Sequence, residues 1–418
     1  MKLKFSVPNS NYKNVTDWPL YPKKGGRKME SSDRTCSDLP GFVSSFVDAF
    51  VDFSVSGLFF PRNLNPFPPP TRLPATDRLV AIGDLHGDLP KALSALSLAG
   101  LVDPVSGRWT GGSAVAVQIG DVVDRGGDEI RLLYLLHRLK IEASKAGGAL
   151  LTIVGNHEVM NVAGDFRYAT AAALDEFKNW ARWYRAGIAM KRLCPGLEPP
   201  KDPFDGIPKS FPGAKVESWE GIRARIAALR PSGPISTRFI APNPTIVVVG
   251  DSVFVHGGLL HQHVRHGFEE INDEVRSWIL GSTPKTPEYV RGQESVVWLR
   301  KFSDGPECDC GKLAGVLEMI PGARRMVMGH TIQTEGINAV CEDRAVRIDV
   351  GLSKGCGDGI PEVLEIIGGG KEMRVLTANP AFDVKNKEEG EGERKRKEKA
   401  GLGWLVREGG TKQVEVKA

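Results

Sequence analysis

The chain has 418 residues, which allows two or three average domains or one large α/β domain with insertions. Its 55 basic and 51 acidic residues leave a net charge of +4, a balance that does not indicate a nucleic-acid-binding protein. The nearest approach to a membrane span, residues 42–60, is interrupted by Asp48 and Asp52, so no span is expected.

The first 28 residues carry seven Lys and Arg side chains against a single acid, Asp17. We predict that residues 1–35 form a disordered basic extension. An organelle-targeting segment is the alternative, although such segments are usually rich in Arg and Ser.

Residues 36–77 are predicted to form an amphipathic helix followed by a Pro-rich linker. Two rows of apolar residues recur at helical spacing over residues 40–55. Pro40 suits a first helical turn and Gly57 suits the end. We expect this helix to pack on the main domain, with a partner surface as the alternative, and residues 61–74 to be the linker. The two rows are Phe42, Phe46 and Phe50, and Val43, Val47 and Val51.

Residues 78–380 are predicted to form the main α/β domain. Short runs rich in Val and Ile indicate buried strands, and nearly all of the first six end in Gly followed by Asp, Asn or His. Open α/β sheets collect their ligands just past the carboxyl ends of strands. Helical patterns follow the first two runs, at 89–98 and 128–146. The runs are 78–83, 115–120, 150–155, 245–250, 253–256, 326–329, 345–350, 363–367 and 373–377.

Residues 165–240 interrupt this alternation. They contain helical stretches at 169–185 and 219–229 and a Pro-rich loop at 195–212. We interpret them as a helical insertion over the active face that serves substrate selection. Residues 381–418 are predicted to be a charged tail, because residues 385–399 hold seven basic and five acidic residues without apolar periodicity.

Several short polar motifs supply ligands for two adjacent divalent metal ions. Asp84 and His86 alternate along an extended segment and can turn toward one ion, and Asp121 can bridge two ions through its two oxygens. Asn156, His256 and His330 would complete the second site. Mixed carboxylate, amide and imidazole ligands suit Mn, Fe or Zn better than Ca. The motifs are Gly83-Asp84-Leu85-His86-Gly87, Gly120-Asp121-Val122-Val123-Asp124-Arg125-Gly126, Gly155-Asn156-His157-Glu158, His256-Gly257-Gly258 and Gly329-His330-Thr331.

The same motifs offer groups that can handle a phosphate. Two metal ions lower the pKa of a bridging water, and the planar fork of Arg125 can bind phosphate oxygens. His157 is the candidate general acid for the leaving alkoxide, and Asp124 can orient its imidazole. Each motif alone has structural explanations; Asn156 could simply lie at the start of a helix. Together, six suitable ligands at strand ends are improbable as core packing.

These motifs resemble the phosphoprotein phosphatase family of calcineurin-like metallophosphoesterases, and more narrowly the Shewanella-like protein phosphatases. The block from Asp38-Leu39-Pro40-Gly41-Phe42-Val43 to Ser56-Gly57 resembles the non-chloroplast plant branch of that group. The resemblance covers residues 36–367 and implies a β-sandwich flanked by helices in a four-layer α/β arrangement. It also implies one metal on Asp84, His86 and Asp121, and another on Asp121, Asn156, His256 and His330. Arg300 resembles the family's second phosphate-binding arginine, with Arg291 as a nearby alternative.

The resemblance implies a metal-dependent phosphatase acting on phosphoproteins. We expect two divalent metal ions, Mn with Fe or Zn as alternatives, and phosphorylated Ser/Thr substrates with Tyr as a further option. One alternative is a dinucleoside polyphosphate or nucleotide hydrolase, but Glu158 stands where such enzymes would carry Asp. Another is a catalytically inactive module that binds phosphorylated partners. It would require a missing ligand or acid, and none is missing.

The six cysteines show no regular secretory spacing, which favours a reducing compartment and a cytosolic location. A mitochondrial compartment is the alternative if the cysteines are oxidised. Isolated thiols are the default interpretation of these cysteines. The alternative is a redox-sensitive pair, Cys308 with Cys310 or Cys341 with Cys356, and a thiol-redox partner would act through Cys308 and Cys310. The residues His261, His263 and His266 are expected to lie in a loop rather than to bind a third metal.

Overall fold

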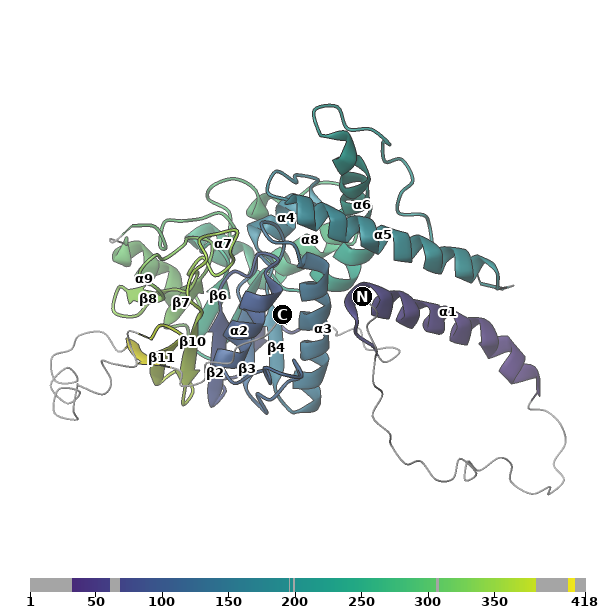
Figure 1. Ribbon diagram of the computed structural model, residues 1–418. Coiled ribbons are helices and arrows are strands. Elements are labelled where there is room, and N and C mark those ends of the chain that lie inside the picture. The colour runs from purple at the N-terminus through teal and green to yellow at the C-terminus, as the bar shows by residue number, and fades with distance from the viewer. Residues whose placement is uncertain are drawn as a thin grey trace, which may run out of the picture.

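The structure is a computed structural model that describes residues 32–60, 68–194, 196–197, 200–305, 308–380 and 405–409. Its centre consists of two six-stranded mixed sheets whose apolar residues form one continuous core (Figure 1). This confirms the predicted α/β fold with a β-sandwich flanked by helices. Most of the predicted basic extension, residues 1–31, lies outside the described residues.

The first sheet has the strand order β1-β5-β6-β7-β9-β8 and the second β12-β11-β10-β2-β3-β4. The neighbours β2, β3 and β4 run parallel, as do β6, β7 and β9. The bounds are β1 Arg72–Leu73, β2 Arg78–Ile82, β3 Val115–Gln118, β4 Ala149–Thr152, β5 Ile246–Val249, β6 Ser252–Val255, β7 Arg325–Met328, β8 Asn338–Val340, β9 Ala345–Arg347, β10 Glu362–Ile367, β11 Glu372–Thr377 and β12 Leu405–Gly409.

Helices cover the sheets and form the insertion. The predicted helices at 89–98 and 219–229 have the observed bounds, whereas α4, α7, α8 and α9 were not predicted. The helices are α1 Ser32–Ser56, α2 Leu89–Leu98, α3 Glu129–Lys145, α4 Asn156–Val162, α5 Ala171–Arg192, α6 Trp219–Leu229, α7 His261–His266, α8 Phe268–Ile279 and α9 Cys310–Glu318, with short helical turns η1 Val216–Ser218, η2 Ser236–Ile240 and η3 Glu288–Val290.

Helix α1 packs against α5 and α3, as expected for an amphipathic helix on the main domain. Val47 and Val51 are buried, and a Cβ at Gly187 of α5 would clash with Val51. The Phe row instead faces outward, with Phe46 69% exposed. The predicted start was wrong, because α1 begins at Ser32 and includes Pro40 within the helix.

Two predicted irregular segments contain strands. β1 lies in the predicted linker and pairs with β5, and β12 lies in the predicted charged tail and pairs with β11. Each is a short strand at a sheet edge, and neither has the apolar run on which the sequence prediction depended. Among the described residues, no helix is long and apolar enough to cross a membrane.

The insertion lies beside the ends of the central strands, where α6 contacts α4 and α5 (Figure 1). Its long helix α5 is attached to the loop after β3. Thr170 Oγ1 accepts a hydrogen bond from Ala173 N as N-cap and donates one to Gly126 O at 2.6 Å. Glu176 accepts the backbone N–H groups of Ile130 and Arg131 at the start of α3. The insertion is therefore connected directly to the loop that carries Asp124.

Candidate metal centre

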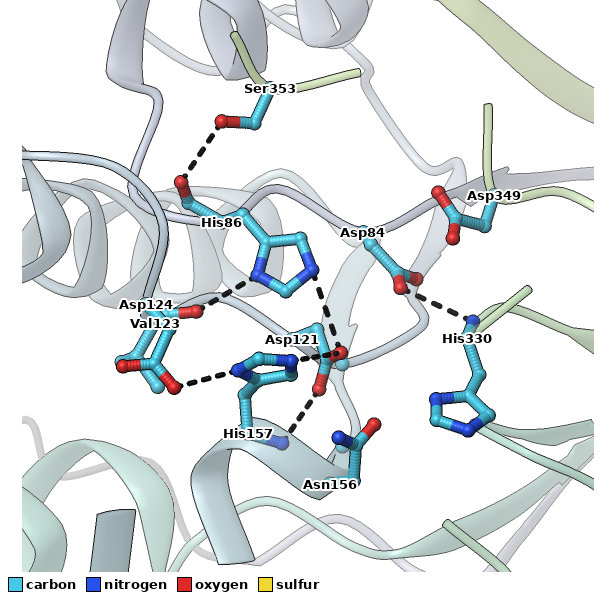
Figure 2. A network of polar contacts seen from close by, with 12 residues as sticks. Asp84, His86, Asp121, Val123, Asp124, Asn156, His157, His330, Asp349 and Ser353 are labelled. Atoms are coloured by element: carbon cyan, nitrogen blue, oxygen red, sulfur yellow. Dashed lines mark hydrogen bonds and ion pairs between the residues drawn. The ribbon is translucent and has the colours of Figure 1, made fainter. Parts of the chain in front are cut away.

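Polar side chains at the ends of five strands, parallel within each sheet, meet at one place. The predicted metal ligands directly follow these strands, and all except His256 are labelled in Figure 2. None is more than 7% exposed. They are Asp84 and His86 after β2, Asp121 after β3, Asn156 after β4, His256 after β6 and His330 after β7.

The backbone of the site is held in an uncommon conformation. Five of the predicted site residues have φ angles between 43° and 69°, in the left-handed region that residues other than glycine rarely adopt. Each such conformation costs about 1–3 kcal/mol, and these conformations cluster at functional sites, where the surrounding structure imposes them. The five are His86, Asp121, Asp124, Arg125 and His330.

Two glycines allow the strand-end loops to approach each other. A Cβ on Gly155 would fall on Oδ1 of Asp121, and a Cβ on Gly329 would fall on Oδ1 of Asp84. Each glycine directly precedes a predicted ligand in the sequence. The glycines in the motifs are therefore required by the close packing of the ligands themselves.

The carboxylate of Asp121 lies at the centre of the site. Its Oδ2 is 3.2 Å from His256 Nε2, 3.6 Å from His86 Nε2 and 3.8 Å from His157 Nε2 (Figure 2). Burial works to raise the pKa of Asp121, but the nearby His256 and His157 outweigh it and hold that pKa well below its usual value. An anionic carboxylate in this position suits a bridge between two cations.

Backbone carbonyls orient two of the ligand histidines. The Nδ1–H of His86 donates to Val123 O at 3.0 Å, and that of His256 donates to Ile119 O at 2.8 Å. Because a carbonyl can only accept, Nδ1 of each ring carries the proton, which directs Nε2 toward the other polar side chains of the site. Burial works to lower the pKa of His256, but the carboxylate of Asp121 outweighs it and raises that pKa. Metal-binding histidines are typically oriented in this way. Burial lowers the pKa of His86 to about 4, which keeps its ring neutral.

Two buried atoms of the ligand set, Asp84 Oδ1 and His330 Nε2, have no hydrogen-bond partner among the described residues. Burial and the carboxylates of Asp349 and Asp121 raise the pKa of Asp84 well above its usual value. Burial, together with His256, lowers the pKa of His330. An unpartnered buried acceptor costs about 1–3 kcal/mol, and a cation would satisfy both atoms and offset the crowding of carboxylates.

The donor set therefore fits divalent metal ions. Two groups of three side chains have ligand atoms within 4.8 Å of one another, and Asp121 belongs to both. In the first group the candidate acid His157 takes the place that the sequence prediction gave to Asp84. The groups are His86, Asp121 and His157, and Asp121, His256 and His330.

The predicted acid and its carboxylate partner lie together. His157 Nδ1–H donates to Asp124 Oδ2 at 2.6 Å, so Nε2 of His157 faces the metal ligands (Figure 2). Burial works to lower the pKa of His157, but Asp121 and Asp124 outweigh it and raise that pKa. The ring is thus disposed to carry a proton, as a general acid requires.

The two predicted phosphate-binding arginines also lie near the ligands. Arg125 places its guanidinium 4.7 Å from the ring of Tyr168, and its buried Nε has no partner among the described residues. Arg300 donates to His330 O at 2.7 Å and to Thr331 Oγ1 at 2.9 Å. The ring of Tyr168 also lies 5.0 Å from that of His157, so Tyr168 lines the same site.

Sequence reasoning did not predict the buried groups behind the ligands. Glu158 is 2% exposed, and its carboxylate accepts four backbone N–H groups, those of Asp121, Val122, Val123 and Gly155. It joins the loop after β3 to the start of α4. Its position in the Gly155-Asn156-His157-Glu158 motif was a usable signal. Asp349, beside Asp84 in Figure 2, and Arg225, an insertion residue that reaches Asp124, had no comparable signal.

The remaining candidate clusters differ from the predictions. The three closely spaced histidines lie in helix α7 rather than in a loop, and no metal-binding group in the described chain includes them. Cys310 forms a disulfide with Cys341, so the expectation of isolated thiols was wrong for these two. Neither the pair Cys308 and Cys310 nor the pair Cys341 and Cys356 forms.

Comparison with known proteins gives the family. Residues 77–331 match the model of the calcineurin-like phosphoesterases. The chain belongs to this family. It is 55% identical over 395 residues to Shewanella-like protein phosphatase 2 of Arabidopsis thaliana, an alignment that covers 93% of this chain and 99% of the relative. The chain is therefore a Shewanella-like protein phosphatase by family, and a hydrolase.

Further similarities agree with this assignment. An uncharacterised protein of Schizosaccharomyces pombe is 32% identical over 329 residues, covering 75% of this chain and 87% of the relative. The crystal structure of a cold-active protein-tyrosine phosphatase from a psychrophilic Shewanella species has a TM-score of 0.54 at 17% identity, covering 76% of this chain and 86% of the other. At that identity the similarity establishes the fold.

The first prediction concerns Glu158. Replacing Glu158 by Gln exchanges a carboxylate that accepts four N–H groups for an amide that carries donors itself. We expect the metal-free protein to lose about 2–4 kcal/mol of unfolding free energy, measured by urea denaturation. Glu220→Gln, at a side chain that is 75% exposed, is the control and should change little. Equal midpoints for E158Q and wild type would contradict the assigned role.

Proposed function

We propose that the protein removes phosphate from phosphoproteins, using the metal centre at the ends of β2, β3, β4, β6 and β7. The observation that supports this most directly is the combination of the ligand set around Asp121 with the hydrogen-bonded pair of His157 and Asp124. The name of the Arabidopsis relative, a protein phosphatase, points to the same substrate class. The complete set of candidate groups argues against an inactive binding module.

In this proposal Asp84, His86 and Asp121 would hold the first metal. The second metal would be held by Asp121, Asn156, His256 and His330. When bound, the two ions would lower the pKa of a water and polarise the phosphoryl group. The mixture of carboxylate, amide and imidazole donors supports Mn as the metal, with Fe or Zn as alternatives.

The protein's own groups would bind the phosphate and protonate the product. Arg125 and Arg300 would bind phosphate oxygens through their planar forks. His157 would donate its Nε2 proton to the departing oxygen while Asp124 holds Nδ1. An alkoxide leaves poorly without a proton, whereas a phenolate leaves more easily. The hydrogen-bonded acid therefore supports phosphoserine and phosphothreonine as preferred substrates, with phosphotyrosine possible.

We also propose that a thiol-redox partner acts on the Cys310–Cys341 disulfide. The bridge joins the start of α9 to the turn between β8 and β9, so it encloses β7 and the ligand His330. Burial raises the pKa of Cys308, whose sulfur lies within 4.8 Å of the bridged pair, so its thiol is a weak nucleophile. The disulfide, rather than the predicted Cys308 and Cys310 pair, would be the group exchanged.

The same disulfide supports a proposal about the location of the protein. A cytosolic location was expected for reduced cysteines, and cytosolic proteins rarely keep structural disulfides. The bridge between Cys310 and Cys341 supports the alternative, a mitochondrial compartment. We therefore propose the mitochondrial alternative, with the cytosol as the competing location.

The substrate class is tested with a panel of phosphopeptides and dinucleoside polyphosphates. We expect chelator-treated protein to be inactive, and Mn to restore hydrolysis of phosphoserine and phosphothreonine peptides more than of phosphotyrosine peptides. Samples reconstituted with Zn or Fe, together with metal analysis of the same preparations, identify the metal that supports activity. Cleavage of the dinucleoside polyphosphates alone would instead establish the alternative, a nucleotide hydrolase.

The acid is tested by replacing His157 with Asn. We expect kcat on a phosphoserine peptide to fall by about 10² to 10⁴-fold, since general acid catalysis contributes about that much. Metal content, measured on the same sample, should stay close to that of wild type. His266→Asn, in α7 at a side chain that is hydrogen-bonded to Glu274, is a control at a histidine outside the site. Unchanged turnover in H157N would refute the assignment.

The redox proposal is tested in cell fractions and with purified protein. We expect alkylation after fractionation to find Cys310 and Cys341 blocked in the mitochondrial fraction, and reduction to change activity. Cys310→Ser should lower stability by about 2–4 kcal/mol, whereas Cys194→Ser in the insertion should not. Protein found only in the cytosol with both thiols alkylated, and equal activity in reduced and oxidised samples, would dismiss both proposals.

A further inference from the structure

Arg225 of helix α6 lies directly behind the pair of Asp124 and His157. Its side chain is fully buried, and its guanidinium contacts three side chains from other elements. Nη2 donates to Asp124 Oδ1 at 2.8 Å, Nε donates to Asn161 Oδ1 at 2.8 Å, and Nη1 donates to Glu129 Oε1 at 3.0 Å. We propose that Arg225 is a positioning residue for the general acid, which the insertion supplies. The proposal rests on the proposed function, because it takes His157 as the acid.

Hydrogen bonds to both carboxylate oxygens hold Asp124 in place. Its Oδ2 accepts from His157 Nδ1 at 2.6 Å and from Asn161 Nδ2 at 2.9 Å, and its Oδ1 accepts from Arg225. A carboxylate bound on both oxygens cannot rotate about its Cβ–Cγ bond without losing hydrogen bonds. Arg225 thus fixes the plane of the carboxylate, and with it the direction of the hydrogen bond to the imidazole.

Asn161 gives Arg225 a second route to the acid. The Nε–H of Arg225 needs an acceptor, so the amide of Asn161 turns its oxygen toward Arg225. Its Nδ2 then faces the other way, where it donates to Asp124 Oδ2 and to His157 O at 2.8 Å. Arg225 therefore sets the orientation of the amide that holds both members of the acid pair.

The alternative is that Arg225 only joins helices. An ion pair with Glu129, at 2.8 Å from Nη2 to Oε2, would by itself connect α6 to α3. The guanidinium also contacts the acid pair, because the same Nη2 donates to Asp124 Oδ1, the oxygen that does not bind His157. The rings of Phe177 and Phe166 lie 4.7 Å and 5.6 Å from the guanidinium carbon, and they limit the space for water that could replace it.

Substrates with different leaving groups can show whether Arg225 positions the general acid or only joins helices. A misplaced His157 slows the loss of an alkoxide, which needs a proton, far more than the loss of a nitrophenolate, which does not. A loss of packing or metal would slow both alike. We therefore compare three substrates in the presence of Mn, namely a phosphoserine peptide, a simple alkyl phosphate and p-nitrophenyl phosphate.

The test variant is Arg225→Lys, which keeps the charge and removes the planar fork. We expect kcat on the phosphoserine peptide and the alkyl phosphate to fall by about 10²-fold, kcat on p-nitrophenyl phosphate by less than about fivefold, and KM to stay within about twofold. Arg223→Lys is the matched control on the same helix, where the guanidinium lies over Phe204 away from the acid. It should leave all three substrates unchanged.

A second variant covers the case in which R225K does not fold. The double variant R225Q/E129Q removes one buried cation and one buried anion together, so no new net charge is buried. It should show the same dependence on the leaving group at a melting temperature close to wild type. Equal losses on all three substrates, a change in KM alone, or wild-type kcat in R225K would overturn the proposal.

The experiment distinguishes a failure of the proposed function from a failure of the role proposed for Arg225. If the wild-type protein does not cleave phosphopeptides, the comparison of the alkyl phosphate with p-nitrophenyl phosphate still decides whether Arg225 positions the acid. If it cleaves phosphopeptides and R225K loses activity equally on every substrate, the function stands and the role of Arg225 is wrong.

Discussion

The whole site depends on the buried carboxylate of Asp121. The fold places it where the strand ends of the two sheets meet. Because β2, β3 and β4 run parallel in one sheet and β6 and β7 in the other, each strand presents its next residues at the same edge. Polar groups gathered in this way cannot satisfy one another completely, and Asp84 Oδ1 and His330 Nε2 have no partner among the described residues. The same crowding that would destabilise a metal-free core makes this edge suitable for cations.

The residues that meet at the site could be predicted from the sequence because their signal is local. A short apolar run followed by glycine and a polar residue specifies both the strand and the side chain beyond its end, and the structure explains the glycines at 155 and 329 by close packing. Edge strands β1 and β12 lack an apolar run, and the true start of α1 at Ser32 lies before the proline that seemed to begin it. Local periodicity does not detect such features, because pairing partners distant in the sequence determine them.

Long-range contacts account for the rest of what the sequence did not show. Arg225 lies 101 residues from Asp124 along the chain, and Cys310 pairs with a cysteine 31 residues away. No spacing rule connects such residues. In the sequence, Arg225 cannot be distinguished from an exposed arginine on a helix. Only the fold shows that it lies against two carboxylates. The sequence prediction considered pairs of cysteines that are close in the sequence. The observed disulfide instead joins a helix to a turn between strands.

Different parts of the fold support His330 on one side of the centre and His157 with Asp124 on the other. His330 and the segment around β7 lie within the loop closed by the disulfide, while His157 and Asp124 are held by Asn161 of α4 and Arg225 of α6. Helix α6 packs on α5, and α5 in turn packs on α1, where Asp52 forms an ion pair with Arg238 after the insertion helices. We therefore expect a disturbance of the insertion to affect the proposed proton donor, His157, before it affects the proposed ligand His330. A disturbance of the disulfide should affect His330 first. The proposed acid pair and the proposed ligand His330 thus depend on separable parts of the fold.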